Sequence, residues 1–109
     1  MAITGIYANV ACSDLARSRD WYETLFGRAP DAEPMDGLVE WHWDPHGFQL
    51  HNDPAKAGNG TLTLMTSGLH AEKARLAGLG AGEVEPAAHF SILRLRDPDG
   101  NLVVLAGDA

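Results

Sequence analysis

The sequence holds a single cysteine, Cys12, and no long hydrophobic run. One cysteine excludes an intrachain disulfide and a cluster of thiolate metal ligands. No window of the sequence approaches the length of a membrane span, and the first residues lack the basic segment and apolar stretch of a secretion signal. These absences lead us to expect a soluble cytoplasmic protein.

Positive charge is scarce as well. The sequence has 8 Lys and Arg against 15 Asp and Glu, which gives a formal net charge of −7 at pH 7. Without a Lys/Arg cluster to neutralise phosphates, a nucleic-acid partner is not expected. The acidic balance would suit a cationic ligand, although an acidic surface also serves solubility alone.

A turn motif of the form Asp-Pro-x-Gly occurs twice, at Asp44 and at Asp97, in a chain whose 109 residues correspond to one domain. Each copy stands between two stretches in which apolar and polar residues alternate. This is the pattern of a turn that joins two strands. The repeated turn therefore indicates a repeated structural unit.

The elements around the two turns follow the same order. In the first half, Ser13 or Asp14 provides the N-cap of a helix that ends at Gly27. The predicted strands and second helix are, in order, strands 6–10, 38–43, 48–51 and 61–65, helix 69–79, and strands 83–85, 90–96 and 102–105. A weak edge strand is expected after the first helix. The chain is thus predicted to contain two repeats of a β-α-β-β-β unit. Module one spans residues 1–52, a polar linker spans 53–60 and module two spans 61–109.

Two segments resemble one known group of proteins. Members of the vicinal oxygen chelate superfamily have a second half similar to residues 76–107, LAGLGAGEVEPAAHFSILRLRDPDGNLVVLAG. Their first strand and helix are similar to residues 9–27, NVACSDLARSRDWYETLFG. The group includes glyoxalase I, extradiol dioxygenases, fosfomycin-resistance enzymes and bleomycin-resistance proteins. The resemblance implies an α+β fold in which paired βαβββ modules form curved mixed sheets around a cup, and it implies a homodimer.

Strand alternation predicts which residues line such a cup. Apolar positions on one face of each strand are expected to pack under the helices, which leaves the other face for the cup. The cup positions predicted in this way are Tyr7, Asn9, Gln49, His51, Thr61, Thr63, Met65, Leu102 and Val104. By the resemblance, the residue three before the first Asp of each turn also points inward, which adds Trp41 and Arg94. Further candidates are Val39, Trp43, Ile92 and Arg96, and Glu40 is expected on the opposite strand face.

Metal-using members of the superfamily take their ligands from the first and last strands of each module. The matching positions here are Tyr7, His51, Thr61 and Val104. A phenol, one imidazole, a hydroxyl and an aliphatic side chain lack the donor set of a divalent metal site. We therefore expect no metal and no other cofactor.

Several candidate residues also have a purely structural interpretation. His51 is as compatible with an ordinary surface strand as with a cup. Trp41 and Trp43 could be core or interface aromatics, and Arg94 could pair with Glu40 or another carboxylate. For other positions the structural interpretation is favoured. Trp21 and Tyr22 are expected in the core rather than in a site, and Asp97, Asp99, Gly100 and Asn101 are assigned to turn chemistry.

Three kinds of function fit these observations. The favoured one is metal-independent binding or sequestration of a small, partly aromatic ligand, with Trp41 and Trp43 as an aromatic wall. An enzyme of the lyase or isomerase type would use His51 as general base and Tyr7 or Arg94 to stabilise an oxyanion. The third is an interaction module whose cup is closed by its own side chains. Sequestration is favoured because it requires no catalytic group.

We predict that the purified protein holds no stoichiometric divalent metal. Elemental analysis should find only traces of zinc, nickel, manganese and iron, and a chelator should leave thermal stability unchanged because no metal-binding free energy contributes to folding. A metal ion held in every chain through His51 would contradict this prediction.

Overall fold

The computed structural model describes residues 1–109, and the two predicted modules are present. The first contains β1 (Tyr7–Cys12), α1 (Leu15–Phe26), β2 (Ala32–Met35), β3 (Leu38–Trp43) and β4 (His46–Asn52). The second contains β5 (Thr61–Met65), α2 (Leu69–Arg75), the 3-10 helix η1 (Ala77–Leu79), β6 (Glu85–Pro86), β7 (Ser91–Arg96) and β8 (Leu102–Gly107). The predicted α+β fold of two βαβββ modules is confirmed.

The helix ends follow from local chemistry. Of the two N-cap candidates, Asp14 caps α1, because its Oδ1 accepts a hydrogen bond of 3.1 Å from the backbone N–H of Arg17. Gly27 ends α1 with a left-handed φ of 73°. The second predicted helix is shorter than expected, since Leu76 leaves helical geometry and η1 follows it. Leu76 is fully buried, and Gly78, two residues later, disfavours continuation of the helix.

Each module forms one four-stranded mixed sheet. The first sheet has the strand order β1-β4-β3-β2 and the second has the order β5-β8-β7-β6. In both sheets the first strand is parallel to the last, and the remaining neighbours are antiparallel. β1 and β5 lie at the ends of their sheets, so each has one edge without a strand partner.

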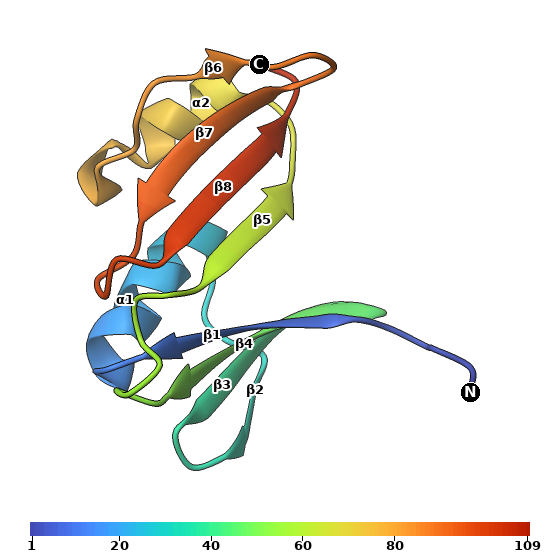
Figure 1. Ribbon diagram of the computed structural model, residues 1–109, viewed down its shortest axis with the longest axis vertical. Coiled ribbons are helices and arrows are strands. Elements are labelled where there is room, and N and C mark those ends of the chain that lie inside the picture. Colours follow the sequence, from blue (N-terminus) through green and yellow to red (C-terminus); the bar gives the residue numbers. More distant parts are fainter.

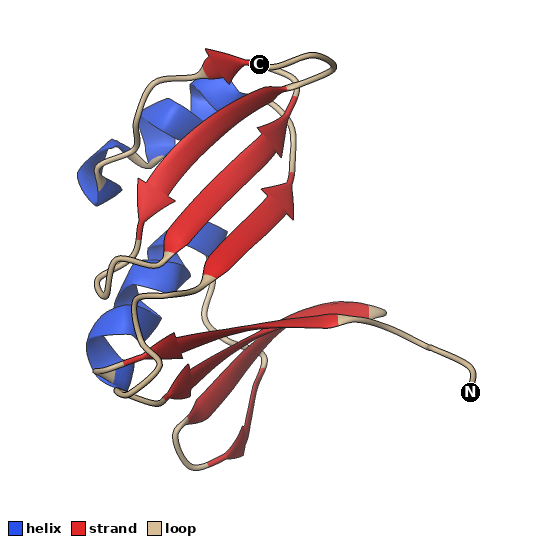
Figure 2. Ribbon diagram, viewed as in Figure 1, coloured by secondary structure: helices blue, strands red, loops and turns tan.

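The helices cover one face of each sheet and leave the other uncovered. Figure 1 shows α1 lying between the two sheets, against the first, and α2 lying behind the second. The uncovered face of the first sheet, here called the first open face, and that of the second sheet, the second open face, point in different directions (Figure 2). No hydrogen bond or ion pair joins them. One chain therefore does not close a cup between its own open faces.

The core lies on the helix-covered sides and is shared by the modules. A single cluster of 15 buried residues includes side chains from α1, α2 and both sheets. Its aromatic centre is in the first module, where the ring of Tyr22 lies 4.9 Å from that of Phe48 and the ring of Phe26 lies 5.1 Å from that of Trp41. The assignment of Tyr22 to the core is confirmed. No helix of the protein is long and apolar enough to cross a membrane.

Polar contacts fix α1 and β1 of the first module to the turn of the second. Tyr22 Oη donates a 2.8 Å hydrogen bond to Asp97 Oδ2, and both residues are buried. Burial, followed by the charge of Asp97, raises the pKa of Tyr22 far above its ordinary value, so the phenol keeps its proton. The backbone N–H of Ser13 donates to Asp99 at 3.0 Å, and Asn101 Nδ2 donates to the carbonyl of Ala11 at 3.0 Å. These contacts set the angle between the modules.

Candidate functional site

The first open face carries polar side chains from three neighbouring strands. Cross-strand pairing places Asn9 beside Gln49, and Gln49 beside Glu40, in one row across β1, β4 and β3. A second row contains Tyr7, Gly47 and His42, and a third contains Ala11, His51 and Leu38. Residues in a row share a face of the sheet, so the side chains on this face are Tyr7, Asn9, Glu40, His42, Gln49 and His51.

A continuous chain of hydrogen bonds crosses this face. Asn9 Nδ2 donates to Gln49 Oε1 at 3.1 Å, and Gln49 Nε2 donates to Glu40 Oε2 at 2.7 Å. The second carboxylate oxygen of Glu40 lies 2.9 Å from His42 Nε2. The hydrogen bonds from His42 and then from Gln49 lower the pKa of Glu40, which is only 9% exposed. Glu40 is therefore ionised at neutral pH.

Tyr7 and His42 form an aromatic pair at one side of this chain. Their ring centroids are 5.9 Å apart in an edge-on arrangement. The Tyr7 ring crosses above Gly47, where a Cβ atom would collide with the ring. Gly47 therefore allows the aromatic pair to form.

His51 lies on the same face but apart from Tyr7, Glu40 and His42. Its Nε2 is 3.7 Å from Asp53 Oδ2, and its Nδ1 is buried without a hydrogen-bond partner. The row that contains Tyr7 lies four residues away along β4, which corresponds to about 13 Å at the usual strand rise. The structure thus does not bring Tyr7 and His51 together as an acid–base pair.

The second open face carries the predicted residues of the second module. Thr61 and Thr63 are exposed, Val104 is half-buried beside Thr63, and Met65 is exposed at the end of the strand. Arg94 is exposed and pairs with Glu85 rather than with Glu40. Two further side chains lie on this face: Arg96, whose Nη1 donates to the carbonyl of Gly100 at 3.1 Å, and the half-buried Leu102.

The predicted facing of β3 is wrong. Trp41 is fully buried and packs on Phe26 and Phe48 under α1, whereas Glu40 lies on the open face where Trp41 was expected. Trp41 Nε1 is satisfied by the carbonyl of Arg28 at 3.0 Å. The expected aromatic wall of Trp41 and Trp43 is therefore not on the open face.

The error arises from the length of the first turn. Trp43 pairs with His46 across a turn of two residues, whereas Arg96 pairs with Leu102 across a turn of five residues. When the two modules are aligned on the first Asp of each turn, β3 is shifted by one residue, and a shift of one residue exchanges the two faces of a strand. By pairing, Arg94 corresponds to Glu40 and not to Trp41. The same shift affects Val39. It is fully buried under α1, whereas Ile92, its counterpart in the alignment on the turns, is half-buried in β7.

Sequence reasoning missed Glu40 and His42. A signal for both residues is present, because the apolar face of β4 was correctly assigned to Phe48 and Leu50. If β3 is paired with β4 across a tight turn, Trp41 falls opposite Phe48 and Glu40 opposite Gln49. Apolar residues then face apolar residues, and both polar residues face outward.

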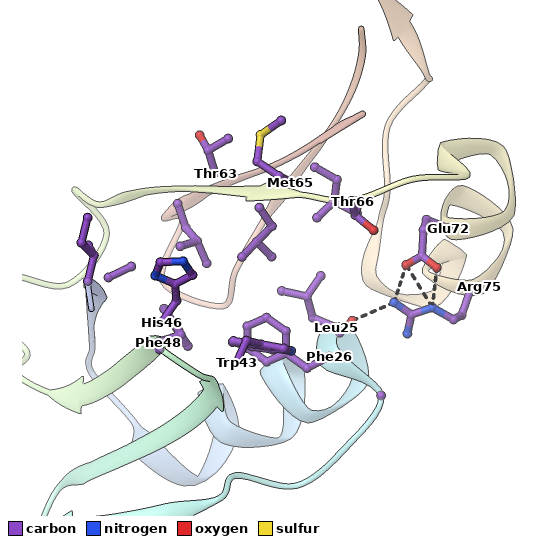
Figure 3. A pocket seen from close by; sticks show the side chains of 17 residues that line it. Leu25, Phe26, Trp43, His46, Phe48, Thr63, Met65, Thr66, Glu72 and Arg75 are labelled. Atoms are coloured by element: carbon purple, nitrogen blue, oxygen red, sulfur yellow. Dashed lines mark hydrogen bonds and ion pairs between the residues drawn. The ribbon is translucent and has the colours of Figure 1, made fainter. Parts of the chain in front are cut away.

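A cavity of about 800 Å³ lies between the modules rather than on either open face. Its walls come from β1, the end of α1, the hairpin of β3 and β4, β5, and α2. Figure 3 shows Trp43, His46 and Phe26 below β5, while Thr63 and Met65 point away on its other side. Glu72 and Arg75 lie at one end, where Arg75 Nη2 donates to the carbonyl of Leu25 at 2.7 Å. Trp43 thus lines this cavity, which we call the notch, and its ring packs on Phe26.

Comparison with known proteins identifies the family. Residues 7–106 match the model of the glyoxalase-like domain. The chain belongs to the glyoxalase-like domain family.

Solved structures of glyoxalase-like fold agree over the whole chain. A glyoxalase/bleomycin resistance protein from Catenulispora acidiphila superposes with a TM-score of 0.86 and 23% identity, over 98% of this chain and 100% of the other. An antibiotic-binding protein from a Streptomyces species gives a TM-score of 0.84 at 23% identity, over 100% of this chain and 99% of the other. A structure described as an oxidase gives a TM-score of 0.79 at 11% identity, over 100% of this chain and 96% of the other. At these identities the likeness establishes the fold. No curated protein matches the sequence.

The residues of this glyoxalase-like domain do not fit the metal that many members of the superfamily use. Of the four matching positions, Tyr7 and His51 lie on one open face, two rows apart, and Thr61 and Val104 lie on the other. No group of three or more His, Cys, Asp or Glu side chains is arranged to hold an ion.

The corrected facing of β3 predicts opposite roles for two neighbouring residues. Trp41→Ala should lower the free energy of unfolding by about 3–5 kcal/mol, the usual cost of deleting a large buried aromatic side chain. Glu40→Gln should lower it less at neutral pH. The folded state lowers the pKa of the Glu40 carboxyl. The carboxylate therefore adds to the free energy of unfolding at pH values above its pKa in the unfolded chain, and this addition is lost as the pH falls through its pKa in the folded protein.

Urea unfolding at fixed protein concentration between neutral and acidic pH measures both effects. The difference between wild type and Glu40→Gln should shrink on acidification, while the cost of Trp41→Ala should persist. Equal and pH-independent costs for the two variants would show that the facing of β3 is wrong.

Proposed function

We propose that this protein binds a small organic molecule, without a metal, between the first open face of one copy and the second open face of a second copy. The observation that carries the proposal is that each module presents a polar, uncovered sheet face while the two faces of one chain point apart (Figure 1). Each face alone is a shallow surface. A cup that surrounds a ligand requires both faces.

The second copy binds at the notch between the modules. The unpaired edges of β1 and β5 flank it, and unpaired edges are the usual sites of strand addition. Large apolar side chains stand exposed at its rim, with Ile6 at 68% and Trp43 at 43% exposure. An apolar recess with such a rim is typical of a protein–protein interface. A twofold axis through the notch would bury both edges at once.

This arrangement would also build the cup. If β1 of one copy lies beside β5 of the second, both helices fall on one side of the joined sheets. The two open faces then fall together on the other side. The first open face brings the ionised Glu40 and the aromatic pair of Tyr7 and His42, and the second brings Arg96 and the ion pair of Arg94 with Glu85. Opposite charges on facing walls support this pairing.

The side chains on the two open faces indicate the class of ligand. The rings of Tyr7 and His42 offer a flat surface, the amides of Asn9 and Gln49 are fixed in orientation, and Val104 with Leu102 provides an apolar wall. A small, partly aromatic molecule with oxygen substituents would satisfy these groups. The fold shared with a structure described as an antibiotic-binding protein supports binding and sequestration as the role.

Mixing two blocked variants tests the composite cup. Asn9→Trp fills the first open face and Thr63→Trp fills the second, so each variant alone should lose binding of any ligand that the wild type takes in a screen. In an equimolar mixture, half of the dimers combine the two variants and present one cup free of both substitutions. Titration calorimetry should then recover about a quarter of the wild-type sites.

The same experiment separates the alternatives. A cup formed within one chain would carry one substitution in every copy, so mixing would restore nothing. Light scattering that reports a monomer at micromolar concentration would also contradict the composite cup.

A further inference from the structure

One ring nitrogen of His42 is held and the other is free. Glu40 is an ionised carboxylate and can only accept, so the imidazole must carry its proton on Nε2, which lies 2.9 Å from Glu40 Oε1. In the neutral ring, Nδ1 then presents a lone pair. This Nδ1 makes no hydrogen bond within the chain. The only side-chain polar atom that is both buried and unpaired is Nδ1 of His51, so the unpaired Nδ1 of His42 is not buried. It therefore reaches solvent on the first open face.

His42 is also held at its backbone. Its N–H donates to Asp31 Oδ2 at 2.6 Å, and its carbonyl accepts from Arg28 Nη2 at 2.7 Å. Arg28 and Asp31 are paired with each other at 2.6 Å. With Glu40 on one side of the ring and Tyr7 edge-on at 5.9 Å, the imidazole has a fixed position before any ligand arrives.

We propose that His42 is the proton acceptor of the cup and that the ligand carries an acidic hydroxyl on a conjugated ring, as in a phenol or enol. This inference rests on the proposed binding function. The ligand O–H donates to His42 Nδ1, and the proton moves from the ligand oxygen to that nitrogen. The products are a ligand anion and an imidazolium whose Nε2–H still faces the Glu40 carboxylate. No other bond forms or breaks.

The charges around the site favour an acidic hydroxyl over an amine. Glu40 stabilises the imidazolium that proton transfer creates, in the way a carboxylate does in any histidine–carboxylate pair. Tyr7 is the other titratable group that faces the ring, while Gln49 and Asn9 are neutral. On the second open face Arg94 is already paired with Glu85, whereas Arg96 has no carboxylate partner in the chain and donates to the carbonyl of Gly100. In the composite cup, Arg96 therefore meets the ligand anion and would repel a protonated amine.

Glu40 acts as a positioning residue, and its role can be measured on the protein alone. Nitrogen-15 NMR of the ring distinguishes the two neutral tautomers. Wild-type His42 should be protonated on Nε2 with Nδ1 bare, and Glu40→Gln should lose that preference. A neutral His42 with its proton on Nδ1 would overturn the inference, because no lone pair would then face the ligand.

A coloured phenol tests the proton transfer itself. 4-Nitrophenol absorbs at longer wavelength once ionised, so the spectrum of the bound probe reports its charge. At a pH below the pKa of the free probe, the wild type should give the phenolate band. His42→Asn should reduce the bound phenolate fraction by about ten-fold or more, because the proton acceptor is gone. Glu40→Gln should reduce it by a smaller factor while the probe still binds.

Two controls separate this inference from the proposed function. His70→Asn, an exposed position on α2, should leave the band unchanged. 4-Nitroanisole, which has no ionisable hydroxyl, should bind wild type and His42→Asn equally. If both probes bind but the phenolate band is absent, or survives in His42→Asn, the inference is wrong and the binding function stands. If neither probe binds the wild type, the proposed function fails and this inference fails with it.

Discussion

Asp97 is buried at the junction of the two modules, and its carboxylate accepts four hydrogen bonds. Three come from its own turn, from the backbone of Asp99 and from the backbone and side chain of Asn101, at 2.8–3.0 Å. The fourth comes from Tyr22 in α1. A buried carboxylate is stable only when it is satisfied in this way. The same contact therefore shapes the second turn and fixes it to the first module.

The angle set by this junction decides what the open faces can do. Because α1 is held between the two sheets, both helix-covered sides join one core, and the open faces point apart (Figure 2). The polar residues predicted for the cup are divided between these two faces instead of lining one enclosed site. A second copy bound in the notch would combine the four shallow faces of the two copies into two cups. The angle between the modules would then determine where the ligand site lies, which charges line it and why it requires a dimer.

The repeated turn, the N-cap at Ser13 or Asp14, the C-cap at Gly27 and the order of the elements along the chain could be predicted from the sequence, because each depends on residues that are close in the chain. The polar faces of β1, β4 and β5 were also predictable from alternation. Two features were missed. The facing of Trp41 depends on a turn three residues shorter than its counterpart, and it follows from the sequence only when β3 is paired with β4. The angle between the modules depends on Tyr22 meeting a residue 75 positions away, which no local pattern indicates.

The most direct test of the composite cup is a distance measurement between copies. Cys12 is buried and its pKa is raised to about 11, mainly by burial, so a spin label would react with a cysteine introduced at Asn9 on the first open face. Labelled chains are mixed with nitrogen-15 chains that carry no label. The account predicts that amides of β5, β7 and β8 in the unlabelled copies are broadened. Broadening that is absent from those strands, or confined to α2, would contradict it.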